Sequence, residues 1–332
     1  MDRTLIRANL NENPFNPIRE FEREIIKTFK EIEINRYPDP EYKELRKALA
    51  DRLNVDIDNI AIGNGSDELI LYILLAFHRK GFPLVITHPT FGMYEKAGKL
   101  LGMKILKFNL KEDWGLPKKD IEEAVKNGAV IFLGYPNNPT ANCWPEKDII
   151  DVIDKNPGIT IIDEAYYEFS GKTLLNLVRE RQNVIILRTF SKALSLAGAR
   201  VGYAISHKNN IDVLNEVRLP FNISLFSEKL ALFMLNQTSW IKEKVKEVIE
   251  NRDWLFAKLS TLTFLKPYPS ETNFILCKVL YENLDVIAFL KEKDIEIRKP
   301  DMEGNYIRIS IGKREEVEKI WLSLKELQEK LK

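Results

Sequence analysis

Predicted strands and helices alternate along most of the chain, and this alternation limits the possible folds more than any other feature. Short apolar runs predict strands at residues 59–62, 84–87, 104–108, 129–134, 160–163, 184–187 and 200–206. Helices are predicted near residues 69–77, 90–101, 117–127 and 145–155. Such a pattern indicates an α/β fold, with a mostly parallel sheet covered by helices on both faces. The apolar runs at 130–133 and 159–162 fit strands buried on both sides.

Both ends of the chain depart from the alternation. Residues 1–15 look irregular, and helices are predicted at 17–33 and 41–53. Two helices are predicted at 208–216 and 223–236, and a long amphipathic helix follows, with Ile241, Val245 and Val248 on one stripe. Beyond it, strands near 273–277, 295–298 and 306–311 and helices near 284–293 and 314–331 indicate a smaller α+β domain. For 332 residues we predict an N-terminal arm and helix (1–35) that pack with the small domain and the active site, a large domain (36–240) and a small domain (241–332).

Composition excludes several classes of function. The net charge is +1, from 50 basic and 49 acidic residues, so we expect neither a nucleic-acid partner nor an anionic membrane surface. No apolar run reaches transmembrane length, and the first residues lack the apolar core of a signal peptide. Cys143 and Cys277 form no metal or disulfide pattern, and the three histidines show no ligand spacing, so we expect no metal and a cytoplasmic location.

Residues capable of chemistry follow four of the predicted strands. They are His88 to Phe91, Tyr135 to Thr140, Asp163 to Tyr167, and the segment around Lys192. The carboxyl ends of parallel strands form the edge of the sheet where ligands bind. A glycine turn at 63–68, between a strand and a helix, offers free N–H groups and the positive end of a helix dipole to an anion.

Together these residue types match the needs of pyridoxal phosphate. This cofactor requires a lysine for its aldehyde, a carboxylate for its ring nitrogen, donors for its ring oxygen, an aromatic plate, and an anion site for its phosphate. Each residue also has a simpler interpretation alone. Lys192 could be a solvated surface lysine, and Asp163 a helix cap. Their joint order along the sheet favours the cofactor site.

The order and spacing of these segments resemble the fold-type I aminotransferases. Pro-Asn-Asn-Pro-Thr contains Asn138, Asp163 of Asp-Glu-Ala-Tyr follows 25 residues later, Lys192 a further 29, and Arg200 eight beyond it. More narrowly the chain resembles the histidinol-phosphate aminotransferase family. The matching stretches are residues 11–15, 36–40, 63–68, 163–167, 188–193, 218–222 and 307–312.

The resemblance implies a role for each matching residue. Lys192 would bond the cofactor and move the substrate proton, and Asp163 and Tyr166 would act as catalytic residues at the ring nitrogen and ring oxygen. The implied cofactor-binding residues are Ser66, Asp67, Phe91, Asn138, Asp163, Tyr166, Thr189, Ser191, Lys192 and Arg200, with Tyr37 supplied by the other subunit of a homodimer with shared sites. Those implied for the substrate are Arg308, Arg298, Asn138 and Asn11, with the N-terminal segment as a lid.

The implied reaction is the transfer of an amino group from L-histidinol phosphate to 2-oxoglutarate, in histidine biosynthesis. Alternatives of the same fold are a threonine-phosphate decarboxylase-like enzyme and an aminotransferase for aromatic or acidic amino acids. A catalytically inactive binding module is a further alternative. The chain departs from the family pattern at Ala141, which replaces the usual glycine, and a positive φ there would strain the alanine.

Overall fold

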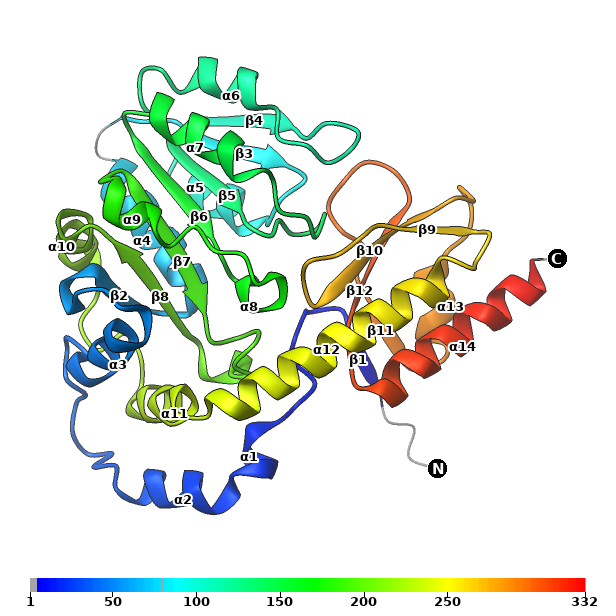
Figure 1. The fold of residues 1–332 in the computed structure, drawn as a ribbon, viewed down its shortest axis with the longest axis horizontal. Helices are drawn as coiled ribbons and strands as arrows, with labels where there is room; N and C mark the ends of the chain where they lie inside the picture. The colour runs from blue at the N-terminus through cyan, green and yellow to red at the C-terminus, as the bar shows by residue number, and fades with distance from the viewer. Residues whose placement is uncertain (1–4, 79–80, 332) are drawn as a thin grey trace.

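The computed structural model of the protein describes residues 5–78 and 81–331. Within this part of the chain the main sheet has seven strands in the order β2-β8-β7-β6-β5-β3-β4 (Figure 1). The strands are β2 (Ile60–Asn64), β3 (Leu84–His88), β4 (Ile105–Asn109), β5 (Val130–Gly134), β6 (Ile159–Asp163), β7 (Val184–Thr189) and β8 (Val201–Ser206). β8 runs antiparallel to both neighbours, whereas the pairings from β7 to β4 are parallel. The predicted mostly parallel α/β sheet is confirmed.

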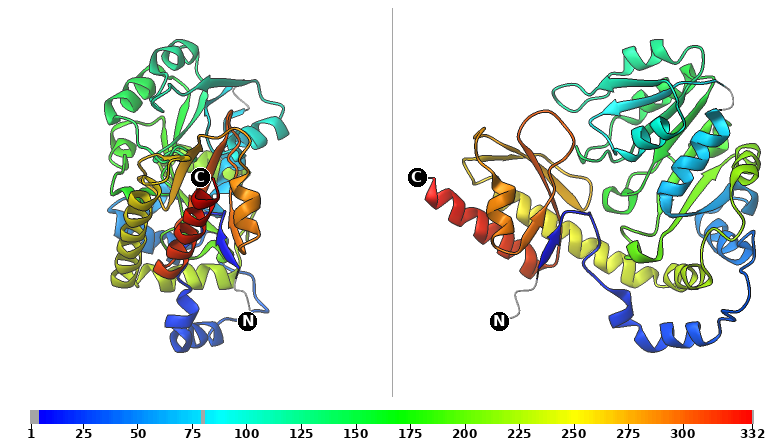
Figure 2. Two further views of the ribbon diagram at one scale, coloured as in Figure 1. Left: turned by 90° about the vertical axis from the view of Figure 1, so that its right-hand side faces the viewer. Right: turned by 180° about the vertical axis from the view of Figure 1, so that it is seen from behind.

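Helices cover both faces of this sheet because its strands are apolar on both sides. Val130 and Phe132 of β5 belong to one core, while Ile131 and Leu133 belong to the other. The first core is closed by α4 (Gly65–His78), α5 (Met93–Leu100) and α10 (Lys208–Val217), and α4 lies in front of the sheet in the right-hand view of Figure 2. The second core is closed by α3 (Lys43–Leu53), α6 (Lys118–Ala124), α7 (Glu146–Lys155), α8 (Tyr167–Ser170), α9 (Leu177–Glu180) and α11 (Leu225–Leu235).

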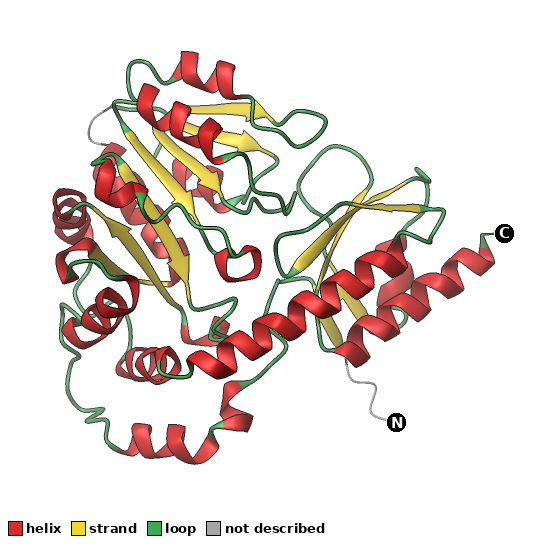
Figure 3. Cartoon of the chain, viewed as in Figure 1, coloured by secondary structure: helices red, strands yellow, loops and turns green. Residues whose placement is uncertain are grey.

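The long helix α12 (Thr238–Leu259) leads from the large sheet to the C-terminal elements (Figure 3). There β9 (Leu265–Pro267), β10 (Phe274–Val279) and β12 (Tyr306–Ser310) form an antiparallel sheet beside α13 (Val286–Lys291) and α14 (Arg314–Lys330). β11 (Ile295–Ile297) pairs in parallel with β1 (Ile6–Ala8). The expectation that residues 1–15 are irregular is therefore wrong at β1, whose three residues pair with a strand from the far end of the sequence.

The predicted continuous helix at 17–33 is also wrong. Two helices, α1 (Pro17–Glu20) and α2 (Glu22–Lys30), meet at Phe21, whose backbone is not helical. The Phe21 ring packs edge-on against Phe233 and Trp240, with centroids 5.5 and 5.7 Å away. This packing stabilises the non-helical backbone at Phe21, whereas apolar periodicity alone predicted one continuous helix. Short 3-10 turns, η1 (Ile57–Asn59) and η2 (Ala197–Ala199), complete the elements.

Contacts between the large sheet's loops and the C-terminal elements fix the loops after β4 and β5. The Trp114 ring contacts the rings of Tyr268 and Tyr306, with centroids 5.5 and 6.0 Å away. The Glu271 N–H donates to the Ala141 carbonyl at 2.8 Å, and its carboxylate accepts from the Cys143 N–H at 3.0 Å. The domain limits given above stay a prediction. Among the described residues, no helix is both long and apolar enough to cross a membrane.

A buried ion pair joins the ends of β6 and β7. The Arg188 guanidinium donates twice to Glu164, at 2.8 and 2.9 Å, and the two side chains are 2% and 0% exposed. Thr173 donates its hydroxyl to the same carboxylate at 2.9 Å and accepts from Arg188 at 2.8 Å. Because Glu164 follows Asp163 and Arg188 precedes Thr189, this pair sets the relative position of the two strand ends.

Replacing Arg188 with methionine should lower the free energy of unfolding by about 3–5 kcal/mol, because the Glu164 carboxylate stays buried without its cation. Urea unfolding of the ligand-free protein measures the loss. The control is Arg181→Met, since Arg181 pairs with the half-exposed Asp154 and should cost less than about 1 kcal/mol. Equal losses in the two variants would contradict the role assigned to the buried pair.

Candidate active site

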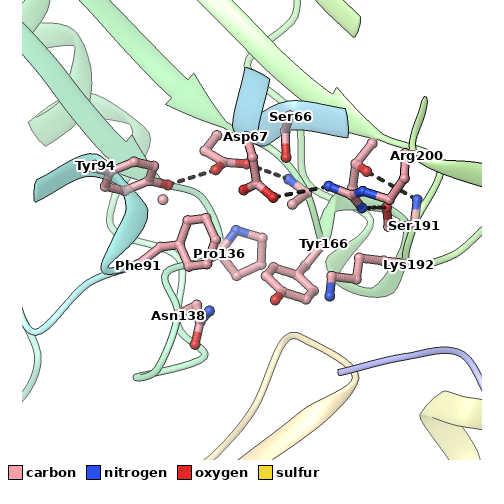
Figure 4. Close-up of a pocket in the computed structure, with 14 residues that line it drawn as sticks. Ser66, Asp67, Phe91, Tyr94, Pro136, Asn138, Tyr166, Ser191, Lys192 and Arg200 are labelled. Atoms are coloured by element: carbon pink, nitrogen blue, oxygen red, sulfur yellow. Dashed lines mark hydrogen bonds and ion pairs between the residues drawn. The ribbon is translucent and has the colours of Figure 1, made fainter. Parts of the chain in front are cut away.

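A pocket opens at the carboxyl ends of the parallel strands, between them and the start of α4 (Figure 4). Its volume is about 100 Å³. Ten of the residues predicted from the sequence line it, namely Ser66, Asp67, Phe91, Asn138, Asp163, Tyr166, Thr189, Ser191, Lys192 and Arg200. The structure thus brings together segments that are up to 134 residues apart in the chain, as the topology of the sheet requires.

One end of the pocket is built for an anion. The first turn of α4 begins at Gly65, whose φ is +75°, and a Cβ there would collide with the Arg200 guanidinium. Arg200 donates to the Asp67 carboxylate at 3.0 Å and to the Ser191 hydroxyl at 3.4 Å. The Ser66 hydroxyl and the free N–H groups of the helix end complete a set of donors. A phosphate group fits this chemistry.

Arg200 does not begin the strand, contrary to the sequence prediction. β8 begins at Val201, and Arg200 has a left-handed backbone with φ of 53°. Its side chain points from there toward Asp67 and Ser191 in Figure 4. The hydrogen bonds of the guanidinium offset part of the strain of this backbone conformation.

The other end of the pocket holds a buried carboxylate. Asp163, the last residue of β6, is 6% exposed. Burial raises the pKa of Asp163 to about 6, although hydrogen bonds from the Tyr94 hydroxyl and the Ala165 N–H act in the opposite direction. Those bonds measure 2.7 and 3.0 Å. A cationic nitrogen placed beside Asp163 would be strongly stabilised.

Lys192 lines the same pocket. Its amine donates to the Leu10 carbonyl at 3.1 Å and lies 5.7 Å from the centre of the Tyr166 ring. In Figure 4 the Lys192 side chain extends alongside Tyr166. An aldehyde-bearing ligand with its anion at Arg200 would therefore meet the only lysine among the described residues that line this pocket.

A second cavity, of about 420 Å³, adjoins the first and shares Phe91, Asn138, Tyr166 and Lys192 with it. Arg298, Arg308 and the arm residues Asn9, Leu10 and Asn11 also line it. Arg308 donates to the Asn138 side-chain oxygen at 2.7 Å and to the Asn9 carbonyl at 2.8 Å. Arg298 and Arg308 exchange two backbone hydrogen bonds, so the predicted substrate residues do come together.

Asn11 lines the second cavity and bonds Tyr166, which lines both. It is 1% exposed, has φ of 55°, and donates to the Tyr166 hydroxyl at 3.0 Å. The Ser310 hydroxyl donates to its side-chain oxygen at 2.8 Å. Asn11 therefore links the Tyr166 hydroxyl to Ser310.

Tyr37 is apart from the other predicted residues. Its side chain is 80% exposed and stacks on Phe221, with ring centroids 4.7 Å apart. It is not among the described residues that line either cavity. Its predicted place is in the site of a second subunit, so its position in a single chain does not test that role.

The sequence analysis missed Tyr94, Gly134, Pro136 and Ala165, which also line the first pocket. Pro136 and Ala165 lie within the predicted segments 135–140 and 163–167, and Gly134 adjoins the first of them, so nearness in sequence was a usable signal. Tyr94 lies in the first turn of α5 and Phe91 just before that helix, and the two rings meet edge-on at 5.6 Å. Ala141 does have a positive φ, 64°, as the missing glycine suggested.

Comparisons with known proteins show the family to which the chain is similar. The sequence profile of the family described as aminotransferase class I and II matches residues 3–323. A histidinol-phosphate aminotransferase of Pyrococcus furiosus is 40% identical over 96% of this chain and 91% of its own length. One of Caldanaerobacter subterraneus is 40% identical over 92% and 88%. A solved histidinol-phosphate aminotransferase of Sinorhizobium meliloti, in complex with pyridoxal-5'-phosphate, is 26% identical with a TM-score of 0.89, covering 99% of this chain and 92% of its own.

The raised pKa of Asp163 predicts a pH dependence of stability. Between the usual pKa of 3.8 and about 6, the folded ligand-free protein binds a proton at Asp163 that the unfolded chain releases. Stability should therefore fall as pH rises through this window, by up to about 3 kcal/mol from this group. Asp163→Asn removes the effect, so urea unfolding should show the variant gaining on wild type between pH 4 and pH 7. A constant difference across this range would contradict the assignment.

Proposed function

Because the chain belongs to the class I and II aminotransferase family, we propose that it transfers the amino group of L-histidinol phosphate to 2-oxoglutarate with pyridoxal 5'-phosphate as cofactor. The products are imidazole-acetol phosphate and L-glutamate, and the reaction serves histidine biosynthesis. One observation carries the proposal: the Lys192 side chain, the buried Asp163 carboxylate and the anion site at Arg200 line a single pocket. With two unpaired cysteines among the described residues, we infer a cytoplasmic enzyme.

Each group around the cofactor has a definite task. When bound, pyridoxal phosphate supplies an aldehyde for amines and a protonated ring that accepts electrons. Asp163 keeps the proton on the ring nitrogen, and the start of α4 with Ser66, Ser191 and Arg200 binds the phosphate. Phe91, which lines the pocket, would lie against the ring face, and the Ser191 N–H donates to the Thr189 hydroxyl at 3.1 Å.

The donors to the cofactor's ring oxygen are selected by their other hydrogen bonds. The Tyr166 hydroxyl already accepts from Asn11, so its own proton is free to donate to the ring oxygen. The Asn138 side-chain oxygen already accepts from Arg308, so the N–H₂ group of Asn138 is left to donate to the ring oxygen. The arm and the small sheet therefore set the polarity of both donors before a ligand arrives.

The second cavity suits the two anionic substrates. Histidinol phosphate carries a phosphate, whereas glutamate carries carboxylates, and the planar guanidinium of Arg308 bonds either one. Arg298 lies beside it on the adjoining strand position. The amine of Lys192 then lies within the same space to remove and return the proton at the substrate's α-carbon.

We also propose a homodimer with shared sites. Large apolar side chains are exposed along residues 18–37 and 219–226, namely Ile18, Ile26, Ile34, Tyr37, Leu219, Phe221 and Phe226. Exposed apolar groups that gather on one surface mark an interface. In the proposed dimer Tyr37 reaches the phosphate bound in the partner's pocket.

The first test is a half-reaction. The cofactor-loaded enzyme should lose its visible absorbance on adding histidinol phosphate and release imidazole-acetol phosphate. Lys192→Ala should slow this by roughly a thousandfold or more, because the proton carrier is lost. Lys208→Ala, which alters a surface ion pair with Asp212, serves as control.

Carbon dioxide release from threonine phosphate would instead support the decarboxylase-like alternative, and a colourless protein would support the inactive module. Phenylalanine and aspartate in the same assay test the broader aminotransferases.

The second test addresses the shared site. Tyr37→Ala should weaken cofactor binding about 10-fold to 100-fold, because a hydrogen bond to the phosphate is lost. Subunits carrying Tyr37→Ala and subunits carrying Lys192→Ala, mixed and allowed to exchange, should regain activity at low cofactor. Such a hybrid has one site with both residues intact. A monomer in sedimentation, or no recovery after confirmed exchange, would exclude the shared site.

A further inference from the structure

We propose that Tyr94 is a positioning residue that acts through Asp163. Its hydroxyl holds the Asp163 carboxylate ionised and oriented toward the cofactor's ring nitrogen, and thereby keeps that nitrogen protonated. The inference rests on the proposed function and deepens it. It adds a residue outside the Lys192–Asp163 pair to those that control how well the cofactor ring accepts electrons.

The geometry places Tyr94 directly on the carboxylate. The Tyr94 hydroxyl lies 2.7 Å from Oδ2 of Asp163, and the Ala165 N–H lies 3.0 Å from Oδ1 (Figure 4). Each carboxylate oxygen therefore has one fixed donor and keeps a lone pair for a cofactor. With both oxygens held, the Asp163 side chain has little freedom to rotate away from the pocket.

Tyr94 is itself held rigidly. Its side chain is 1% exposed, its ring stacks on Phe132 at 4.7 Å, and it meets Phe91 edge-on at 5.6 Å. Phe91 is the predicted plate for the cofactor ring, so one residue links the plate to the carboxylate. Because Tyr94 belongs to α5 and Phe132 to β5, packing of the helix on the sheet fixes the hydroxyl's place.

The charges around the pair favour this role. Burial raises the pKa of Asp163, whereas the hydrogen bond from Tyr94 lowers it and so favours the carboxylate. Burial and the charge of Asp163 raise the pKa of Tyr94 well above its usual value, so the hydroxyl keeps its proton. The other titratable groups that act on Asp163 are Asp67, which raises its pKa, and Lys192, which lowers it.

Removal of the hydroxyl has a specific consequence for the loaded enzyme. A carboxylate with one donor fewer holds a proton more strongly, so the proton shared with the ring nitrogen moves toward Asp163. The ring then carries less positive charge and accepts electrons less well. Because the ring is less positive, it disfavours a positive charge on the cofactor-bound Lys192 nitrogen less strongly. That nitrogen therefore keeps its proton up to a higher pH.

The test is Tyr94→Phe, which keeps the ring and its packing. The pH midpoint of the bound cofactor's visible absorbance should rise by about one unit. The rate constant kcat should fall about 10-fold to 100-fold, the range for a hydrogen bond to a charged group, with the KM for histidinol phosphate nearly unchanged.

Tyr72→Phe is the matched control. Tyr72 is also a buried tyrosine that donates to a carboxylate, that of Glu68, at 3.1 Å, but it does not line the described part of the pocket. This variant should leave the midpoint and kcat as in wild type. Thermal unfolding of the cofactor-free proteins checks that both variants are folded.

A double substitution tests whether Tyr94 acts through Asp163. In an Asp163→Asn background, Tyr94→Phe should change neither the midpoint nor kcat further. Additive effects, or a Tyr94→Phe midpoint equal to that of wild type, would overturn the proposal. These outcomes differ from failure of the proposed function, in which wild type itself binds no cofactor or does not react with histidinol phosphate.

Discussion

The site depends on keeping one carboxylate, that of Asp163, buried at the end of a parallel strand. Burying an ionisable group is costly unless donors or a cation compensate. In this protein the compensation comes from Tyr94, from a backbone N–H, and by proposal from a cationic ring nitrogen. The sheet keeps this carboxylate buried, because the residues of β6 are 0–6% exposed. The neighbouring strands β5 and β7 lead into the loops that carry Asn138 and Lys192. The fold thus creates a strong preference for a cationic ligand before any ligand is present.

Much of this architecture was predictable because it follows from local pattern. Double-sided apolar runs identified the buried strands, and the rule that ligands bind at their carboxyl ends predicted that Lys192 and Asp163 would meet. Arg200, which precedes a strand, was assigned to the site by resemblance. Long-range contacts were not predictable in the same way. β1 pairs with a strand almost 290 residues later, and the break at Phe21 depends on Phe233 and Trp240. No local periodicity encodes such partners.

The role of Tyr94 within the site was likewise not predictable from local sequence pattern. In sequence it is an apolar position of an amphipathic helix, and its ring does pack as one, on Phe132. Only the fold reveals that the hydroxyl reaches Asp163, 69 residues away. The substrate residues differ again. Arg298 and Arg308 were singled out by resemblance, and their proximity to Lys192 arises because the arm and the small sheet close over the large one.

Four of the nine described non-glycine residues with positive φ lie where these parts meet. Of the described non-glycine residues with positive φ, Asn11, Ala141, Ser195 and Arg200 lie in the arm, the loop after β5, and the loop around Lys192. Each costs free energy that ordinary packing would avoid. Ala141 persists there because its N–H and carbonyl are both bonded, to Asn137 and Glu271, and its side chain is fully buried. Two of these residues use their side chains in the site: Asn11 donates to Tyr166, and Arg200 donates to Ser191 in the anion site. A backbone with negative φ would direct these side chains elsewhere. At Asn11 and Arg200, therefore, an unfavourable backbone conformation accompanies a side-chain direction that the proposed chemistry uses.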